Sequence, residues 1–204
     1  MPKLLYQGHG SYRLTADDGR VIYVDPYAGK GYDVPADFIL VTHQHHDHNR
    51  TSRVTQKAGC RIISNVEALS GGRHNTFDLD GGITVEAVEA RNAKHDPRYC
   101  VGYIVTLDGV KLYCAGDTSM TGQMESFAKR ELDYALLPTD GVFNMGFDEA
   151  ANCATLIGAK HNIPIHMNPL KLFDKHKAVN KWDAPNKLVL APGQEIELKH
   201  EPTK

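Results

Sequence analysis

One short segment places three imidazoles and a carboxylate side by side, at His43, His45, Asp47 and His48. It directly follows residues 38–41, an apolar run that predicts a buried strand. In an extended chain residues two apart point the same way, so His43 and His45 can share one metal ion. Asp47 and His48, at the start of a predicted helix, would turn toward a second ion. A histidine-rich surface loop is the alternative, and it explains this dense spacing poorly.

The bulk composition is that of an ordinary globular protein. A chain of 204 residues fits a single domain spanning 1–204, and 41% hydrophobic with 24% charged residues is typical of a soluble one. The formal net charge of -2 argues against charge-driven nucleic-acid binding. No apolar run approaches the roughly 18 residues of a membrane span, and the first residues do not resemble a signal peptide. We therefore expect a cytoplasmic protein without a membrane or nucleic-acid partner.

Cysteine and histidine are used differently in this chain. The four cysteines are scattered and form no Cys-x-x-Cys pair, which predicts buried thiols instead of a disulfide framework or zinc ribbon. The eleven histidines are more than usual for this length, and five of them follow apolar segments where a metal site could form.

Strand and helix patterns alternate along the chain and predict a layered α/β fold. A polar helix over residues 49–58, closed by Gly59, is expected to link two parallel strands. The other predicted strands cover 4–6, 11–15, 21–26, 61–64, 83–90, 134–138, 163–166, 188–190 and 196–198; the other predicted helices cover 66–69, 123–130 and 148–160.

A predicted hairpin brings two distant polar residues together. If Asp108 and Gly109 form a two-residue turn, Leu107 pairs with Val110. Counting outward then places Asp117 opposite residue 100, at the end of the sheet where His95 emerges from the preceding strand. Two candidate ligands far apart in sequence can thus meet.

Two further residues lie where predicted strands end, and a loop histidine could lie near the site. His166 follows an apolar strand and is a third candidate of this kind. Asp25 ends another strand, where it could orient a ligating imidazole or simply form a turn. His9 stands alone between two glycines, a setting in which histidines are most often structural or solvated.

In combination these motifs resemble the metallo-β-lactamase fold superfamily over nearly the whole chain, and more narrowly its small bacterial metal-dependent hydrolases related to ascorbate-6-phosphate lactonase. The resemblance implies a four-layer αβ/βα sandwich with the site along one edge of two sheets. It also implies a first ion held by His43, His45 and His95, a second held by Asp47, His48 and His166, and Asp117 as the bridge.

Rival ligands and departures from the family pattern can be named. His74 competes with His95 but follows no strand, and His161 competes with His166 but lies at a predicted helix end. His46, His176 and His200 are expected to be exposed. Residues 167–171 differ from the run usual in the nearest relatives, which leaves the substrate open, and no inserted RNA-binding arm is present.

A two-ion centre would use a metal-bridging hydroxide to cleave its substrate, with Asp47 essential to it. Two divalent ions contribute +4, and two aspartates with the hydroxide remove three, so about +1 remains to attract an anion. We therefore expect a hydrolase of small anionic esters, either phosphodiesters or sugar-phosphate lactones. Its ions are expected to be zinc, with manganese, iron or nickel as options. Lys171, Asn168 and Arg98 are candidate anchors for the anion, although surface solvation is the more common role for such side chains.

Two other classes stay open, a non-catalytic metal-binding protein and a di-iron redox enzyme of the same superfamily. The general acid and the oligomeric state are also open, although Tyr27, Thr118, Thr139 and Asp140 lie near the motifs in sequence.

Overall fold

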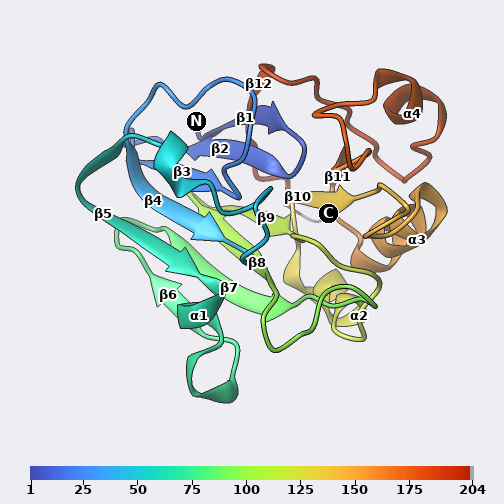
Figure 1. Ribbon diagram of the computed structural model, residues 1–204, viewed down its shortest axis with the longest axis horizontal. Coiled ribbons are helices and arrows are strands. Elements are labelled where there is room, and N and C mark those ends of the chain that lie inside the picture. The colour runs from blue at the N-terminus through green and yellow to red at the C-terminus, as the bar shows by residue number, and fades with distance from the viewer. Residues whose placement is uncertain (203–204) are drawn as a thin grey trace.

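Two six-stranded mixed β-sheets pack face to face in the computed structural model, which describes residues 1–202 (Figure 1). The first sheet has the order β12-β1-β2-β3-β4-β5 and the second β11-β10-β9-β8-β7-β6. The strands are β1 (Lys3–Gly8), β2 (Ser11–Thr15), β3 (Val21–Val24), β4 (Ala36–Val41), β5 (Gln56–Ser64), β6 (Thr76–Asp78), β7 (Thr84–Glu89), β8 (Val101–Leu107), β9 (Val110–Cys114), β10 (Tyr134–Pro138), β11 (His161–Ile165) and β12 (Glu195–Glu197). The predicted α/β sandwich is confirmed.

The main hydrophobic core lies between the sheets, where alternate residues of both contribute buried side chains such as Leu14, Leu40, Val105 and Leu112. A second core forms under α2 (Met124–Phe127) and α3 (Phe147–Ile157), which cover the outer face of the second sheet. The remaining helical segments are α1 (Asn65–Ala68), α4 (Lys175–Asn180) and the 3-10 turns Thr51–Arg53, Ser70–Gly72 and Ala128–Arg130. None of the helices in residues 1–202 is long and apolar enough to cross a bilayer.

The helix predicted over residues 49–58 is wrong. Only the single 3-10 turn Thr51–Arg53 forms there, and Gln56 already belongs to β5. Pairing of β5 with β4 shifts register between Ala36 and Phe38, and the extra β5 residues bulge around Gly59, whose φ is +84°. A bulge accommodates polar, mostly exposed residues that cannot pack as a helix on the sheet. The outer face of the first sheet is covered mainly by loop side chains, including Tyr32, Val34 and Val54.

Three other predictions need smaller corrections. Asp47 and His48 lie in a turn in which the His48 amide donates to the His45 carbonyl, and they do not begin a helix. Residues 188–190 form no strand within the described chain; only an isolated bridge joins Lys187 to Asn162. The predicted helix end at His161 is instead the first residue of β11.

The hairpin prediction is confirmed, since Leu107 pairs with Val110 and the ladder runs out to Tyr103 and Cys114. The strands that carry site residues also share one direction. β3 is parallel to β4, β9 is parallel to β10, and β10 is parallel to β11. Antiparallel pairs on either side of β2 and β8 make β1 parallel to β3 and β7 parallel to β9. Their carboxyl ends therefore meet along one edge, where open α/β sheets place ligands.

Candidate metal centre

Three imidazoles from two strand ends form a first cluster. His43 and His45 follow β4, and His95 follows β7. The His45 Nδ1 lies 3.1 Å from the His43 Nε2 and 3.3 Å from the His95 Nε2. Four donors bound at about 2.0 Å in a tetrahedron around zinc stand about 3.3 Å apart. The spacing of these nitrogens is that of ligands around one ion.

Hydrogen bonds behind this cluster set the tautomers of its two buried imidazoles. The Thr42 hydroxyl donates to Asp25 Oδ2 at 2.7 Å, so it accepts from His43 Nδ1 at 3.0 Å. The His95 Nδ1 donates to Asn92 Oδ1 at 2.9 Å. Because a neutral imidazole carries one proton, both Nε2 atoms present lone pairs to the centre.

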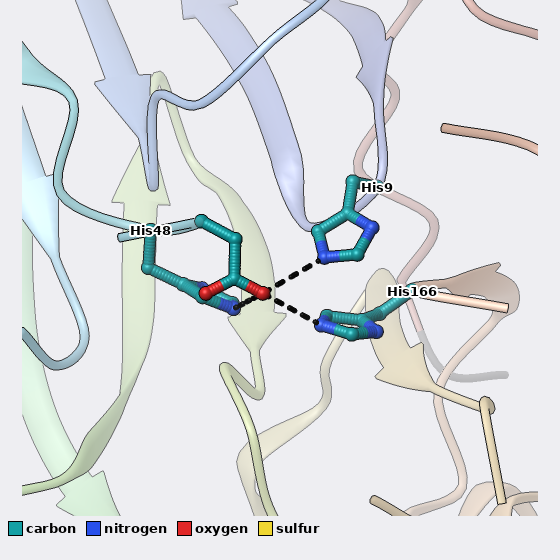
Figure 2. Close-up of side chains that lie close together, drawn as sticks. His9, His48 and His166 are labelled. Carbon is teal, nitrogen blue, oxygen red and sulfur yellow. Dashed lines mark hydrogen bonds and ion pairs between the residues drawn. The ribbon is translucent and has the colours of Figure 1, made fainter. Parts of the chain in front are cut away.

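A second cluster lies next to the first and contains His9, Asp47, His48 and His166. The Asp47 Oδ2 lies 3.1 Å from His9 Nε2, 3.6 Å from His166 Nε2 and 4.0 Å from His48 Nε2. In Figure 2 the side chains of His9, His48 and His166 point toward one another from separate segments of the chain. His9 and His166 have positive φ angles, 56° and 47°, which turn their side chains at the strand ends.

Asp117 lies between the two clusters. Its Oδ1 is 3.2 Å from His48 Nε2, and its Oδ2 is 3.3 Å from His95 Nε2 and 3.7 Å from His166 Nε2. The Asp117 side chain is buried, so water does not compete for these contacts. The carboxylate thus lies close to histidines of both clusters, which is the position of a bridging ligand.

Carboxylates support the histidines of the second cluster from behind. The His48 Nδ1 donates to Asp25 Oδ2 at 2.8 Å, and the His166 Nδ1 lies 2.9 Å from Asp140 Oδ2. Asp25 also accepts from the Thr42 amide and hydroxyl, and Asp140 accepts from the amides of residues 142–144. Both carboxylates are thereby fixed in place, and the imidazoles they contact present Nε2 to the centre.

The two clusters differ in the pKa values of their imidazoles. Burial, reinforced by the positive charge on His48, lowers the pKa of His43 to about 2, and burial also lowers the pKa of His95. Burial opposes the charge on His166, but Asp117, Asp140 and Asp47 raise its pKa to about 9. The pKa of His48 rises well above its usual value for the same reason, since Asp117 and Asp25 outweigh its burial. Burial raises the pKa of Asp117, but the positive charges of His48 and His166 outweigh it and keep that pKa well below its usual range.

Buried polar atoms without hydrogen-bond partners test whether these residues fit a metal. Among the described residues, His48 Nε2, His166 Nε2 and Asp117 Oδ1 are buried and accept or donate no hydrogen bond. Buried polar groups are almost always paired, and each exception needs an explanation. His48 Nε2 and Asp117 Oδ1 lie 3.2 Å apart, and His166 Nε2 lies 3.7 Å from the other Asp117 oxygen. Imidazole nitrogens with carboxylate oxygens are a donor set that suits zinc, manganese, iron or nickel, so the residues fit the implied ions.

The structure brings all seven sequence-predicted ligands together and leaves their rivals outside. His74 is exposed, and His161 lies 3.3 Å from Glu201, away from both clusters. His46, His176 and His200 are exposed as expected, and His200 also contacts Asp133. Whether the seven residues bind metal stays a prediction.

Three contributors carried weaker sequence signals. His9 lies in the second cluster, and its only signal was its position after β1. Asp140 follows β10 but was considered only as a general acid, and Asn92 had no assigned role. Thr118 and Thr139 bond to backbone carbonyls and are not free for proton transfer.

A cavity of about 740 Å³ opens above the two clusters. Its lining includes Lys171 as predicted, and it adds Lys94, Phe143 and Leu170. The other two candidate anchors do not line this cavity. Arg98 pairs with Asp96 on the surface, and Asn168 uses its side chain within its own loop; neither lines the cavity.

Comparison with known proteins agrees with this architecture. Residues 3–166 match the family described as the β-lactamase superfamily domain. A UPF0173 metal-dependent hydrolase of Thermococcus kodakarensis is 32% identical, and the match covers 97% of this chain and all of the relative. A crystal structure from Parabacteroides distasonis is 28% identical with a TM-score of 0.73, covering 91% of each chain. The metallo hydrolase Igni18 of Ignicoccus hospitalis shares the fold, with a TM-score of 0.76 at 23% identity over 97% of this chain and 99% of that one.

The fold and the clustered ligands thus define a protein of the metallo-β-lactamase type. This chain belongs to the β-lactamase superfamily, and it aligns along nearly its whole length with relatives named metal-dependent hydrolases.

Proposed function

We propose that the protein is a metal-dependent hydrolase that cleaves an ester-type bond in a small anionic substrate, a phosphodiester or a sugar-phosphate lactone. The observation that carries this proposal is the convergence of unpaired imidazole and carboxylate atoms, at ligand spacing, on the floor of an open cavity. The names of the curated relatives support the same reaction class.

Each residue has a separate part in holding the centre. His43, His45 and His95 would hold one divalent ion, Asp47, His48 and His166 a second, and Asp117 would bridge them. His9, 3.1 Å from Asp47, either orients that carboxylate or joins the second set. Two ions bound there supply a hydroxide nucleophile near neutral pH and a Lewis acid for the substrate oxygen.

The charges around the cavity support an anionic substrate. Asp47 and Asp117 are the only carboxylates among the described lining residues, and both face the clusters. Two divalent ions would outweigh these two negative charges, leaving a net positive floor.

A hydrolase panel tests the proposal. The protein is stripped with a chelator, reloaded separately with zinc or manganese, and assayed on phosphodiesters, lactones, amides and thioesters with elemental analysis of each preparation. We expect turnover of a phosphodiester or lactone that scales with metal content. Metal-loaded protein that opens only a neutral amide or thioester would contradict the substrate class.

The two alternatives make different predictions in the same experiment. A non-catalytic metal-binding protein would bind two equivalents and cleave nothing on the panel. A di-iron redox enzyme would purify coloured and would lose its colour on reduction. The cavity directly above the clusters favours an enzyme over a purely structural site.

A further inference from the structure

The cavity above the clusters has two cationic and several apolar side chains that the proposed reaction does not use. Its lining includes Lys94, Lys171, Tyr27, Phe143 and Leu170. None of these is a proposed ligand, yet all face the space that a substrate would occupy.

Neither of the two lysines forms an ion pair among the described residues. The lysine ion pairs among residues 1–202 involve Lys3, Lys57 and Lys187, and neither Lys94 nor Lys171 takes part in one. Because the lining carboxylates face the clusters, both ammonium groups can bind an anionic group of a ligand.

Both lysines lie in segments that are fixed beside the clusters. The Lys94 amide donates to Asn92 Oδ1 at 2.8 Å, next to the first-cluster ligand His95. Lys171 precedes Leu172, whose carbonyl accepts from the His9 amide beside the second cluster. The two residues therefore lie near different parts of the cavity floor, one beside each cluster.

The apolar side chains are unusually open for their size. Leu170 is 92% exposed and Phe143 is 44% exposed, although both line the cavity. The Phe143 carbonyl accepts from Asn92 Nδ2 at 2.9 Å, so its segment is tied to the one that carries Lys94. Covering such side chains with an apolar ligand is favourable by roughly 25 cal/mol per Å² of apolar surface, and exposed apolar side chains at a cavity mark a binding surface.

We propose that this cavity selects an anionic phosphoester with an apolar aryl or acyl arm, its negative charge bound by Lys94 and Lys171 and its arm packed on Phe143 and Leu170. The inference rests on the proposed function for the reaction but not for the binding. It favours a phosphodiester with an apolar arm over a sugar-phosphate lactone, because a sugar would leave the apolar wall formed by Phe143 and Leu170 uncovered.

Calorimetric titration with phenylphosphonate and methylphosphonate tests the proposal on metal-loaded protein. Neither compound is an ester, so binding is measured apart from turnover. We expect phenylphosphonate to bind wild-type protein more tightly than methylphosphonate. Lys94→Ala and Lys171→Ala should each weaken phenylphosphonate binding by roughly three- to tenfold. Lys129→Ala, which removes an exposed charge outside this cavity, is the matched control and should not change it.

The apolar wall is tested with Phe143→Ser and Leu170→Ser. Each should weaken phenylphosphonate binding and leave methylphosphonate binding unchanged. Equal binding of both phosphonates by wild-type protein, or lysine variants that bind like wild type, would overturn the inference. The anionic group would then be bound by the metal ions alone. A protein that cleaves nothing on the hydrolase panel but keeps the lysine dependence and the phenyl preference would refute the proposed function and not this one.

Discussion

The two clusters lie side by side but hold their histidines in opposite ways. In the first cluster the buried imidazoles donate to neutral oxygens of Thr42 and Asn92, and burial keeps their pKa values low. In the second cluster the imidazoles contact the carboxylates Asp25 and Asp140, and their pKa values are raised.

This difference separates two ways of preparing a metal site. In the first cluster His43 and His95 are already neutral and present lone pairs, so neither has to lose a proton before an ion binds. The second is a carboxylate-rich pocket in which protons on His48 and His166 supply positive charge when metal is absent. Since a ligating imidazole must be neutral, an ion entering the second cluster displaces those protons. The first set should therefore bind metal with little dependence on pH, and the second set with more.

The largest expected effect comes from removing the second cluster's own carboxylate. Asp47→Ala should reduce turnover by more than about 100-fold, because loss of residues merely behind the ligands already costs 10–100-fold. Elemental analysis should show a fall from two bound ions to one. Asp33→Ala, which removes an exposed carboxylate outside the cavity, is the control. Near-normal activity with one ion bound would break the comparison by making the second cluster dispensable.

Metal removal should expose the second cluster's protons as a dependence of stability on pH. The pKa of His166 is about 9 in the folded chain and roughly 6.5 when unfolded. Its proton therefore stabilises the metal-free protein fully below pH 6.5, and that contribution is lost as pH rises toward 9. The loss is on the order of 3 kcal/mol of unfolding free energy. Urea denaturation of chelator-treated protein at pH 6.5, 8 and 9.5 measures it.

The matched variant for that series is His166→Gln, which should flatten the decline between pH 6.5 and 9. His43→Gln should leave it intact, because His43 is already neutral throughout this range. A metal-free wild-type protein whose stability is constant from pH 6.5 to 9.5 would contradict the raised pKa.

Neutralising the carboxylate behind His166 should have an intermediate effect. Asp140→Asn keeps the shape of the side chain but removes its charge, so we expect affinity for the second ion to fall by roughly 10- to 100-fold while the first ion is unaffected. Competition with a chromophoric chelator resolves the two affinities. An equal loss of affinity for both ions would show that the two clusters act as one unit.

The parts of this centre that the sequence could predict are those set by local patterns, and the parts it could not are those set by tertiary pairing. Strand ends followed from apolar runs, and the hairpin register correctly brought Asp117 to His95 because pairing from a two-residue turn is countable. The helix over residues 49–58 failed because polar residues suit both a helix and a bulged edge strand, and only the pairing of β5 decides between them.

The supporting residues escaped prediction for a different reason. His9, Asp140 and Asn92 are single polar residues without a repeated spacing, and their roles depend on side-chain direction. That direction is set by local backbone, such as the positive φ of His9 and His166, and by loops from distant segments. For Asp25 the sequence left a support and a plain turn equally open, and the parallel pairing of β3 with β4 decides for the support of His48.

The smallest expected effect concerns Asn92, which supports the first cluster through a neutral amide. Its Oδ1 accepts from His95 Nδ1 and from the Lys94 amide, and its Nδ2 donates to the Phe143 carbonyl. Asn92→Ala should lower the affinity for the first ion by about tenfold. This is the low end of the range for such supporting residues, because the hydrogen bond that is lost is uncharged. Asn92→Asp restores an acceptor for His95 but no donor for Phe143. Chelator competition should therefore show recovered affinity for the first ion in Asn92→Asp, whereas calorimetry should show that phenylphosphonate binding stays reduced. Identical defects in both variants would mean that Asn92 maintains the loop as a whole and that the first cluster does not depend on the orientation of His95.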